Sequence, residues 1–110
     1  MHELSITRSV VAIVAEQAAG RQVLSIKLEV GRLSGLMPEA LRFCFELCAR
    51  GTPVDGARLD IVDIAGRGRC HACGAEHCLE QPLGRCPSCQ APALDIVSGE
   101  ELNIKEMEVQ

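Results

Sequence analysis

The chain has 110 residues, 47% of them hydrophobic and 24% charged, a balance that predicts one folded domain with at most a small appendage and excludes a disordered chain. The formal net charge of −4 argues against a nucleic-acid-binding surface, which needs a basic face. No apolar run approaches the roughly 20 residues of a membrane span, so we expect a cytoplasmic protein that binds neither nucleic acid nor a membrane.

The first third of the chain predicts a helix followed by a strand. In residues 4–20 the apolar side chains recur mostly at spacings of three and four, with Ser5 placed to cap the helix and Gly20 to end it. Residues 23–33 change to an alternating pattern, which is typical of a half-buried strand. The predicted helix face comprises Ile6, Val10, Ile13, Val14 and Ala18, and the predicted strand face comprises Leu24, Ile26, Leu28 and Val30.

A second helix and a second strand are predicted next. Residues 38–51 begin with a proline, which suits a first helical turn, and end with a glycine, and residues 57–64 have strand character. The buried stripe of this helix is expected to consist of Leu41, Cys44, Phe45 and Cys48. The two cysteines are four residues apart, a spacing that would suit a metal pair, but their place on the apolar stripe favours core packing.

The segment from residue 66 to about 92 differs from the rest, because glycine, proline and cysteine are dense there and apolar periodicity is lost. Such a segment cannot bury a core of its own, so it needs covalent cross-links or a bound metal ion to stabilise its fold. Strand character returns at 94–97 and 100–109. Apolar residues in the last stretch change phase after Lys105, which predicts either a bulge or a strand that ends there. We expect this final strand to rejoin the main sheet.

Four cysteines in the segment form two Cys-x-x-Cys turns, "CHAC" and "CPSC", separated by 12 residues. Two such turns can place four thiolates around one ion, which is the tetrahedral arrangement of structural zinc sites. The predicted ligands are Cys70, Cys73, Cys86 and Cys89. A redox-active thiol pair, disulfides or an iron site of the same geometry are the alternatives.

Three further residues near these turns could also bind a metal. Four sulfurs already satisfy a zinc ion, so His71, His77 and Cys78 are interpreted as surface side chains and a spare thiol. Either histidine could replace a thiolate under changed conditions. Together these features predict an α+β fold in which two helices pack on a small three-stranded sheet, with an inserted zinc-ribbon-like four-cysteine subdomain.

The opening "MHE" has metal-binding chemistry of its own. The α-amine, with a pKa of about 8, loses its proton easily, and the His2 amide and imidazole can close two chelate rings with it. Three nitrogens in one plane suit Ni(II) or Cu(II), and Glu3 could supply a fourth ligand through its backbone nitrogen or its carboxylate. Because His2 is bulky, we expect Met1 to be retained. The alternative is an ordinary histidine and glutamate that lead into a helix.

The whole chain closely resembles the HypA/HybF family of hydrogenase maturation proteins. The resemblance rests on "MHELSI", "VGRLSGLMPEALRFCFE", the "CHAC" and "CPSC" turns, and "SGEELNIKEMEV". It implies a nickel metallochaperone with transient Ni(II) at Met1, His2 and Glu3 and structural Zn(II) at the four cysteines. It further implies a nickel-binding α+β domain at 1–65, completed by a returning strand at 98–110, and a zinc-binding subdomain at 66–97.

The resemblance also implies partners. These are a HypB-type GTPase and the precursor of the [NiFe] hydrogenase large subunit, with urease maturation proteins as further candidates for some members of the family. The oligomeric state is left open between a monomer and a homodimer.

Three other functions are less consistent with the sequence than nickel delivery. A nucleic-acid-binding zinc ribbon is disfavoured because the basic residues at 66–92 are nearly balanced by acidic ones and no aromatic side chain is available for stacking. An enzyme is disfavoured because no catalytic triad, paired-carboxylate motif or glycine-rich phosphate loop is present. The strongest alternative is a zinc-ribbon protein-interaction adaptor without a nickel delivery role.

Overall fold

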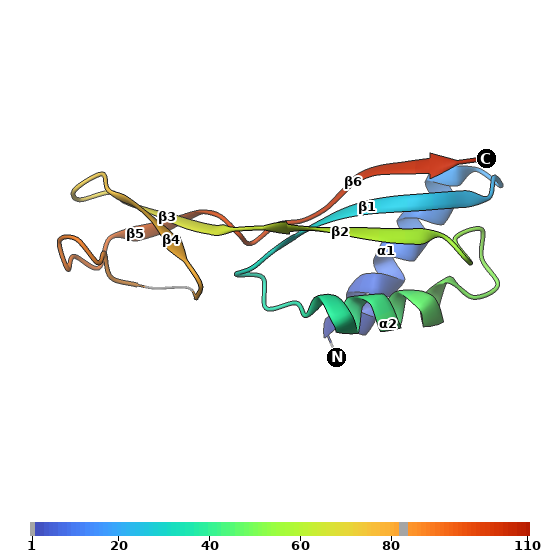
Figure 1. The fold of residues 1–110 in the computed structure, drawn as a ribbon, viewed down its shortest axis with the longest axis horizontal. Coiled ribbons are helices and arrows are strands. Elements are labelled where there is room, and N and C mark those ends of the chain that lie inside the picture. The colour runs from blue at the N-terminus through green and yellow to red at the C-terminus, as the bar shows by residue number, and fades with distance from the viewer. Residues whose placement is uncertain (1, 82–83) are drawn as a thin grey trace. The chain divides into compact units, whose positions relative to one another are not determined.

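The computed structural model describes residues 2–81 and 84–110, with His2 described through its backbone alone (Figure 1). Its helices and strands follow one another along the chain as α1 (His2–Ala18), β1 (Val23–Gly31), α2 (Pro38–Ala49), β2 (Arg58–Ile64), β3 (Gly66–Cys70), β4 (Glu76–Leu79), β5 (Leu94–Ser98) and β6 (Leu102–Val109).

The described strands form two three-stranded sheets, one in the order β2-β1-β6 and the other in the order β4-β3-β5. In the first sheet β6, the last strand of the chain, pairs with β1, so the prediction that the final strand rejoins the main sheet is confirmed. With two helices, two small sheets and a four-cysteine cluster, the structure has the predicted α+β class.

The chain divides into two compact units. The first comprises Met1–Glu29, Leu36–Val62 and Asn103–Gln110, and the second comprises Val30–Gly35 and Asp63–Leu102. The core of the first unit is aliphatic, since both helices and β1 contribute side chains that are almost fully buried. The most buried of these are Val14 of α1, Val23, Ile26 and Leu28 of β1, and Leu41 of α2.

The predicted first helix is correct in position but begins earlier than expected. Because α1 starts at His2, Ser5 lies inside its first turns and is not the N-cap. The buried face is also shifted, since Ile13 is 50% exposed whereas Val11 and Thr7 are buried. Thr7 can be buried without cost because its hydroxyl donates to the carbonyl of Leu4 at 3.1 Å and to that of Glu3.

β6 is one continuous strand to Val109, so of the two predicted alternatives, a bulge or a strand that ends near Lys105, the second is wrong. Its burial pattern nevertheless changes phase at Lys105 and Glu106, which are consecutive exposed residues. The half-buried residues therefore occupy even-numbered positions before Lys105 and odd-numbered positions after Glu106, as the change of phase in the sequence indicates.

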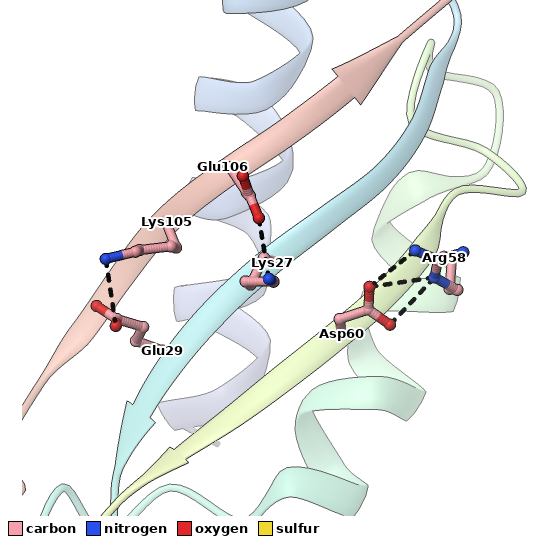
Figure 2. A network of polar contacts seen from close by, with 6 residues as sticks. All are labelled: Lys27, Glu29, Arg58, Asp60, Lys105 and Glu106. Carbon is pink, nitrogen blue, oxygen red and sulfur yellow. Dashed lines mark hydrogen bonds and ion pairs between the residues drawn. The ribbon is translucent and has the colours of Figure 1, made fainter.

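The face of the first sheet that lies away from the helices carries paired charges (Figure 2). Lys27 of β1 contacts Glu106 of β6 at 2.9 Å, and Arg58 contacts Asp60 within β2 at 3.0 Å. Lys105 and Glu29 form a looser pair at 4.0 Å. These exposed pairs contribute little to stability individually, but they leave this face polar and internally matched.

The second unit contains an antiparallel sheet with β3 at its centre. The sequence did not predict β3 or β4, because "GRGRC" alternates glycine with arginine and "EHCL" has no alternation of apolar and polar residues. Cross-strand ion pairs stabilise the exposed face instead, since Glu76 of β4 contacts both Arg67 and Arg69 of β3 at 3.1 Å.

Three glycines of the second unit allow three backbone segments to cross in close contact. A Cβ atom on Gly31 would lie 2.0 Å from the carbonyl oxygen of Gly99, and one on Gly99 would lie 2.5 Å from the Cα of Gly66. Gly99 also has φ of +106°, which disfavours other residues. The side chain of Leu33 packs against Gly66 and Gly99 and fills the remaining space at the crossing.

Candidate metal centre

The four predicted cysteine ligands converge in the second unit. Their Sγ atoms all lie within 4.8 Å of one another, with 3.6 Å between Cys70 and Cys89 and 3.7 Å between Cys73 and Cys86. Four sulfurs bound tetrahedrally at the usual zinc–sulfur distance of about 2.3 Å would be about 3.8 Å apart. The spacing therefore fits a tetrahedral zinc ion and leaves no open coordination position.

The two cysteine turns have the same backbone construction. In each turn the N–H of the first cysteine donates to the carbonyl of an alanine five residues later, at 2.9 and 3.0 Å. The residue directly after the second cysteine has a positive φ and donates its N–H back to the first cysteine's carbonyl, at 2.7 and 2.9 Å. The corresponding positions are Cys70, Gly74 and Ala75 in one turn and Cys86, Gln90 and Ala91 in the other.

Backbone N–H groups point at the sulfur of the first cysteine in each turn. Cys70 Sγ accepts from the N–H groups of Ala72 and Cys73 at 3.4 Å, and Cys86 Sγ accepts from that of Ser88 at 3.3 Å. Cys70 and Cys86 are fully buried, whereas Cys73 and Cys89 are exposed. Each turn thus contributes one inner sulfur, supported by the backbone, and one outer sulfur.

These hydrogen bonds separate the acidities of the thiols. The N–H of Cys73, followed by that of Ala72, lowers the pKa of Cys70 to about 6 against desolvation, and the N–H of Cys89 lowers the pKa of Cys86 in the same way. The Ala91 N–H favours the thiolate of Cys89, but desolvation and the neighbouring sulfurs outweigh it and raise its pKa to about 11. Cys70 is therefore largely ionised at neutral pH, and the same kind of hydrogen bond favours the thiolate of Cys86, the form that binds metal.

His77 lies closer to the cluster than the sequence interpretation expected. Its Nε2 is 3.6 Å from Cys86 Sγ and 3.3 Å from the Ser88 hydroxyl oxygen, and its side chain is half-buried. The pairing of β3 with β4 places His77 opposite Gly68, which has no side chain to hold it away. His71 and Cys78 are exposed, in agreement with the interpretation that they are surface residues.

The predicted nickel site is only partly within the described residues. Met1 and the His2 side chain lie outside them, and the His2 backbone forms the first residue of α1. The Glu3 carboxylate accepts a hydrogen bond from the backbone N–H of Met37 at 3.2 Å. Hydrogen bonds from its own N–H and from Met37 lower the pKa of Glu3, so this carboxylate is ionised near neutral pH.

Glu3 also caps the N-terminus of α2 by accepting the hydrogen bond from Met37. Met37 is the N-cap residue of α2, and its own side chain makes no capping hydrogen bond. A carboxylate from α1 therefore lies at the N-terminus of α2, where a negative charge is favourable.

The cysteine pair of α2 is half-buried, and Cys48 Sγ lies 3.9 Å from the Thr7 hydroxyl of α1, which agrees with a packing role.

Comparison with known proteins identifies the family. The family model described as "Hydrogenase/urease nickel incorporation, metallochaperone, hypA" matches residues 1–109. The chain belongs to the HypA family. The hydrogenase maturation factor HypA of Crocosphaera subtropica is 52% identical over the whole chain and 96% of the relative, and that of Geobacter metallireducens is 51% identical over the whole length of both.

The fold is likewise that of HypA. The solution structure of the Ni metallochaperone HypA from Helicobacter pylori matches with a TM-score of 0.70 at 23% identity, over 97% of this chain and 96% of that one. A second HypA solution structure matches with a TM-score of 0.69 at 24% identity.

Membership of the HypA family settles the general role. The chain is a maturation factor of the nickel metallochaperone class for hydrogenase and not a catalytic enzyme. Such a role implies interaction with the hydrogenase maturation machinery. Of the helices in residues 2–81 and 84–110, none has the length and apolarity needed to cross a bilayer.

Proposed function

We propose that this HypA protein binds Ni(II) through the Met1 amine, the His2 amide and imidazole, and Glu3, and delivers it for [NiFe] hydrogenase maturation. The observation that carries this proposal is the match to the nickel-incorporation family from residue 1. The start of α1 at His2 supports it, because the first N–H groups of a helix have no acceptor within the helix. The His2 amide is thus available for chelation without breaking a helical hydrogen bond.

We propose further that Cys70, Cys73, Cys86 and Cys89 hold a structural Zn(II). The spacing of the four sulfurs supports zinc, and four thiolates leave no position from which a substrate metal could be exchanged easily. In this assignment the nickel-binding domain spans 1–65 with the returning strand 98–110, and the zinc-binding subdomain spans 66–97. Zinc stabilises its own subdomain, and nickel is the cargo.

The proposed recipients follow from the family description, which names both hydrogenase and urease. We propose that a HypB-type GTPase and the hydrogenase large-subunit precursor bind the loaded protein, and that urease maturation proteins are a second destination. Transfer of nickel from the loaded chain to each purified partner, in the presence of a competing chelator, tests these assignments one at a time.

Nickel titration of the zinc-loaded chain tests the proposed ligands. We expect one nickel site in the unaltered protein, and loss of that site both in His2→Ala and in a chain with one residue added before Met1, with zinc retained in each. His71→Ala is the matched control, because His71 is an exposed histidine outside the proposed nickel ligands. Full nickel binding by either altered N-terminus would overturn the assignment.

The affinity for nickel should also depend on pH. Protons compete with the metal for the imidazole and for the α-amine, so we expect weaker binding as the pH falls from about 7.5 to about 5.5. Isothermal titration with nickel at several pH values measures the effect. An affinity that does not change over this range would contradict a nitrogen ligand set.

A further inference from the structure

His77 lies outside the four-cysteine cluster but contacts one of its sulfurs. Its Nε2 is 3.6 Å from Cys86 Sγ. The same nitrogen lies 3.3 Å from the Ser88 hydroxyl oxygen, and the Ser88 N–H donates to Cys86 Sγ at 3.3 Å. Because Cys86 is fully buried, these protein groups take the place of water around its sulfur.

This contact distinguishes the two inner sulfurs of the cluster. Apart from the neighbouring sulfurs, Cys70 Sγ receives hydrogen bonds from two backbone groups, the N–H groups of Ala72 and Cys73. Cys86 Sγ receives a backbone hydrogen bond of the same kind and, in addition, the contact from His77. Since the backbone construction of the two turns is otherwise alike, the imidazole makes the two halves of the site unequal.

The alternation of side chains along β4 places His77 on the less exposed face of this strand. Its neighbours Glu76 and Cys78 are exposed, whereas His77 is half-buried and Leu79 is buried. β4 follows the first cysteine turn along the chain, but the sulfur that His77 contacts belongs to the second turn. The contact therefore connects the sheet to the second turn through a side chain.

The direction of this hydrogen bond follows from the chemistry of the sulfur. If Cys86 binds the proposed structural zinc, on which this role of His77 rests, its sulfur is a thiolate with no proton to donate. Nε2 must then carry the hydrogen, and Cys86 Sγ must accept it. Such a bond withdraws charge from the sulfur and lowers its reactivity toward protons and electrophiles. Groups that hydrogen-bond the ligands of a metal tune its affinity in this way.

We propose that His77 is a positioning residue of the zinc site, which donates a hydrogen bond from Nε2 to the zinc-bound thiolate of Cys86 and slows the release of zinc. It acts through Cys86 and is not itself a ligand, because the four clustered sulfurs already complete a tetrahedral set. Without this donor, more negative charge stays on a buried sulfur, and the second turn gives up the metal more easily. In a protein that handles nickel, a firmly held zinc keeps the cysteines from binding the cargo.

Three variants of the full chain separate the hydrogen bond from the packing of the ring. His77→Phe keeps an aromatic ring without a donor, and His77→Gln keeps a side-chain N–H. His71→Phe is the matched control at an exposed histidine. In competition with a chromophoric zinc chelator, we expect His77→Phe to bind zinc about tenfold more weakly, and the other two to bind it nearly as the unaltered chain does.

Cobalt(II) in place of zinc reports on the sulfur directly. We expect the sulfur-to-cobalt charge-transfer band of His77→Phe to move to lower energy, because a thiolate that has lost a hydrogen bond gives up electron density more easily. The d–d bands should remain those of a tetrahedral four-sulfur site, which shows that all four ligands are still bound. His77→Gln should keep its charge-transfer band close to that of the unaltered chain.

The outcomes separate this role of His77 from the zinc assignment beneath it. An unmoved charge-transfer band in His77→Phe, or a His77→Gln variant that behaves like His77→Phe, would overturn the hydrogen-bond donor and leave the four-cysteine site in place. Absence of the tetrahedral four-sulfur bands from the unaltered chain would overturn the zinc assignment as well. Nickel binding at the N-terminus enters neither measurement.

Discussion

Two residues occupy the same place in the two cysteine turns but differ in conformational freedom. Gly74 has φ of +79° and Gln90 has φ of +67°, and the left-handed region costs a residue with a Cβ more than it costs glycine. The second turn is therefore strained where the first is not. The N–H of residue 90 must still reach the Cys86 carbonyl at 2.9 Å, so the strain cannot be relieved by rotation.

We expect Gln90→Gly to stabilise the zinc-loaded protein by about 0.5–1 kcal/mol and Gly74→Ala to destabilise it by about 1 kcal/mol. Thermal unfolding of the two variants under identical zinc concentrations measures both. If Gln90→Gly lowered the melting temperature, the side chain of Gln90 would have a stabilising role that exceeds its backbone strain.

The cysteines are not equivalent in zinc binding, and a comparison of Cys70→Ser with Cys78→Ser tests this difference. We expect Cys70→Ser to lose zinc, because Cys70 is a fully buried member of the four-sulfur cluster. Cys78→Ser should retain one zinc per chain, since Cys78 is exposed on β4 and outside the cluster. Zinc released on denaturation, measured with a colorimetric chelator, compares the two. Equal zinc loss would contradict the assignment of the cluster.

At the residue scale the sequence predicts which four cysteines gather, but it does not predict which other side chains surround them. Cys-x-x-Cys spacing is local, so two such turns predict the four cysteines that the structure brings together. The contact of His77 with Cys86 depends on how β3 pairs with β4, which the composition of those strands does not reveal.

The glycine crossing is the element-level feature on which the second unit depends. We expect Gly99→Ala to destabilise the protein by about 2–3 kcal/mol, because its Cβ would meet the Gly66 backbone at 2.5 Å and its φ is positive. Gly84→Ala is the matched control, since a Cβ there meets no atom within 4 Å. Chemical denaturation of both variants measures the difference, and equal stability would show that the backbone can separate at the crossing.

Elements with strong apolar periodicity were predictable, and those without it were not. The alternation of Ile26, Leu28 and Val30 predicts β1, and all three are buried. Leu24 belongs to the same pattern but is 47% exposed. The residues of β3 and β4 had no such pattern, because cross-strand ion pairs and packing against glycine take the place of an apolar face.

At the scale of the whole molecule, the two units rely on different sources of stability. The first has an aliphatic core drawn from two helices and a sheet, whereas the buried residues of the second are few and include two of the cysteines. A small sheet of that kind depends on its metal. Removal of zinc should therefore affect the units unequally.

We expect a strong chelator to unfold β3, β4 and β5 while α1 and α2 remain folded. Backbone amide spectra of the intact chain test this, since the amide signals of the small sheet should lose their dispersion and those of α1 should not shift. Re-addition of zinc should restore the spectrum. Simultaneous loss of both sets of signals would show that the core of the first unit also depends on the metal.

The crossing at Gly31, Gly66 and Gly99 has a consequence for anyone who wishes to transplant the cysteine cluster into another scaffold. A cassette cut at the ends of the small sheet would leave behind Gly31 and Leu33, which come from a distant part of the chain and complete the packing at its base. A portable version must carry residues 30–35 as a second strip, or replace them with a host segment that has a glycine and a leucine in the same positions.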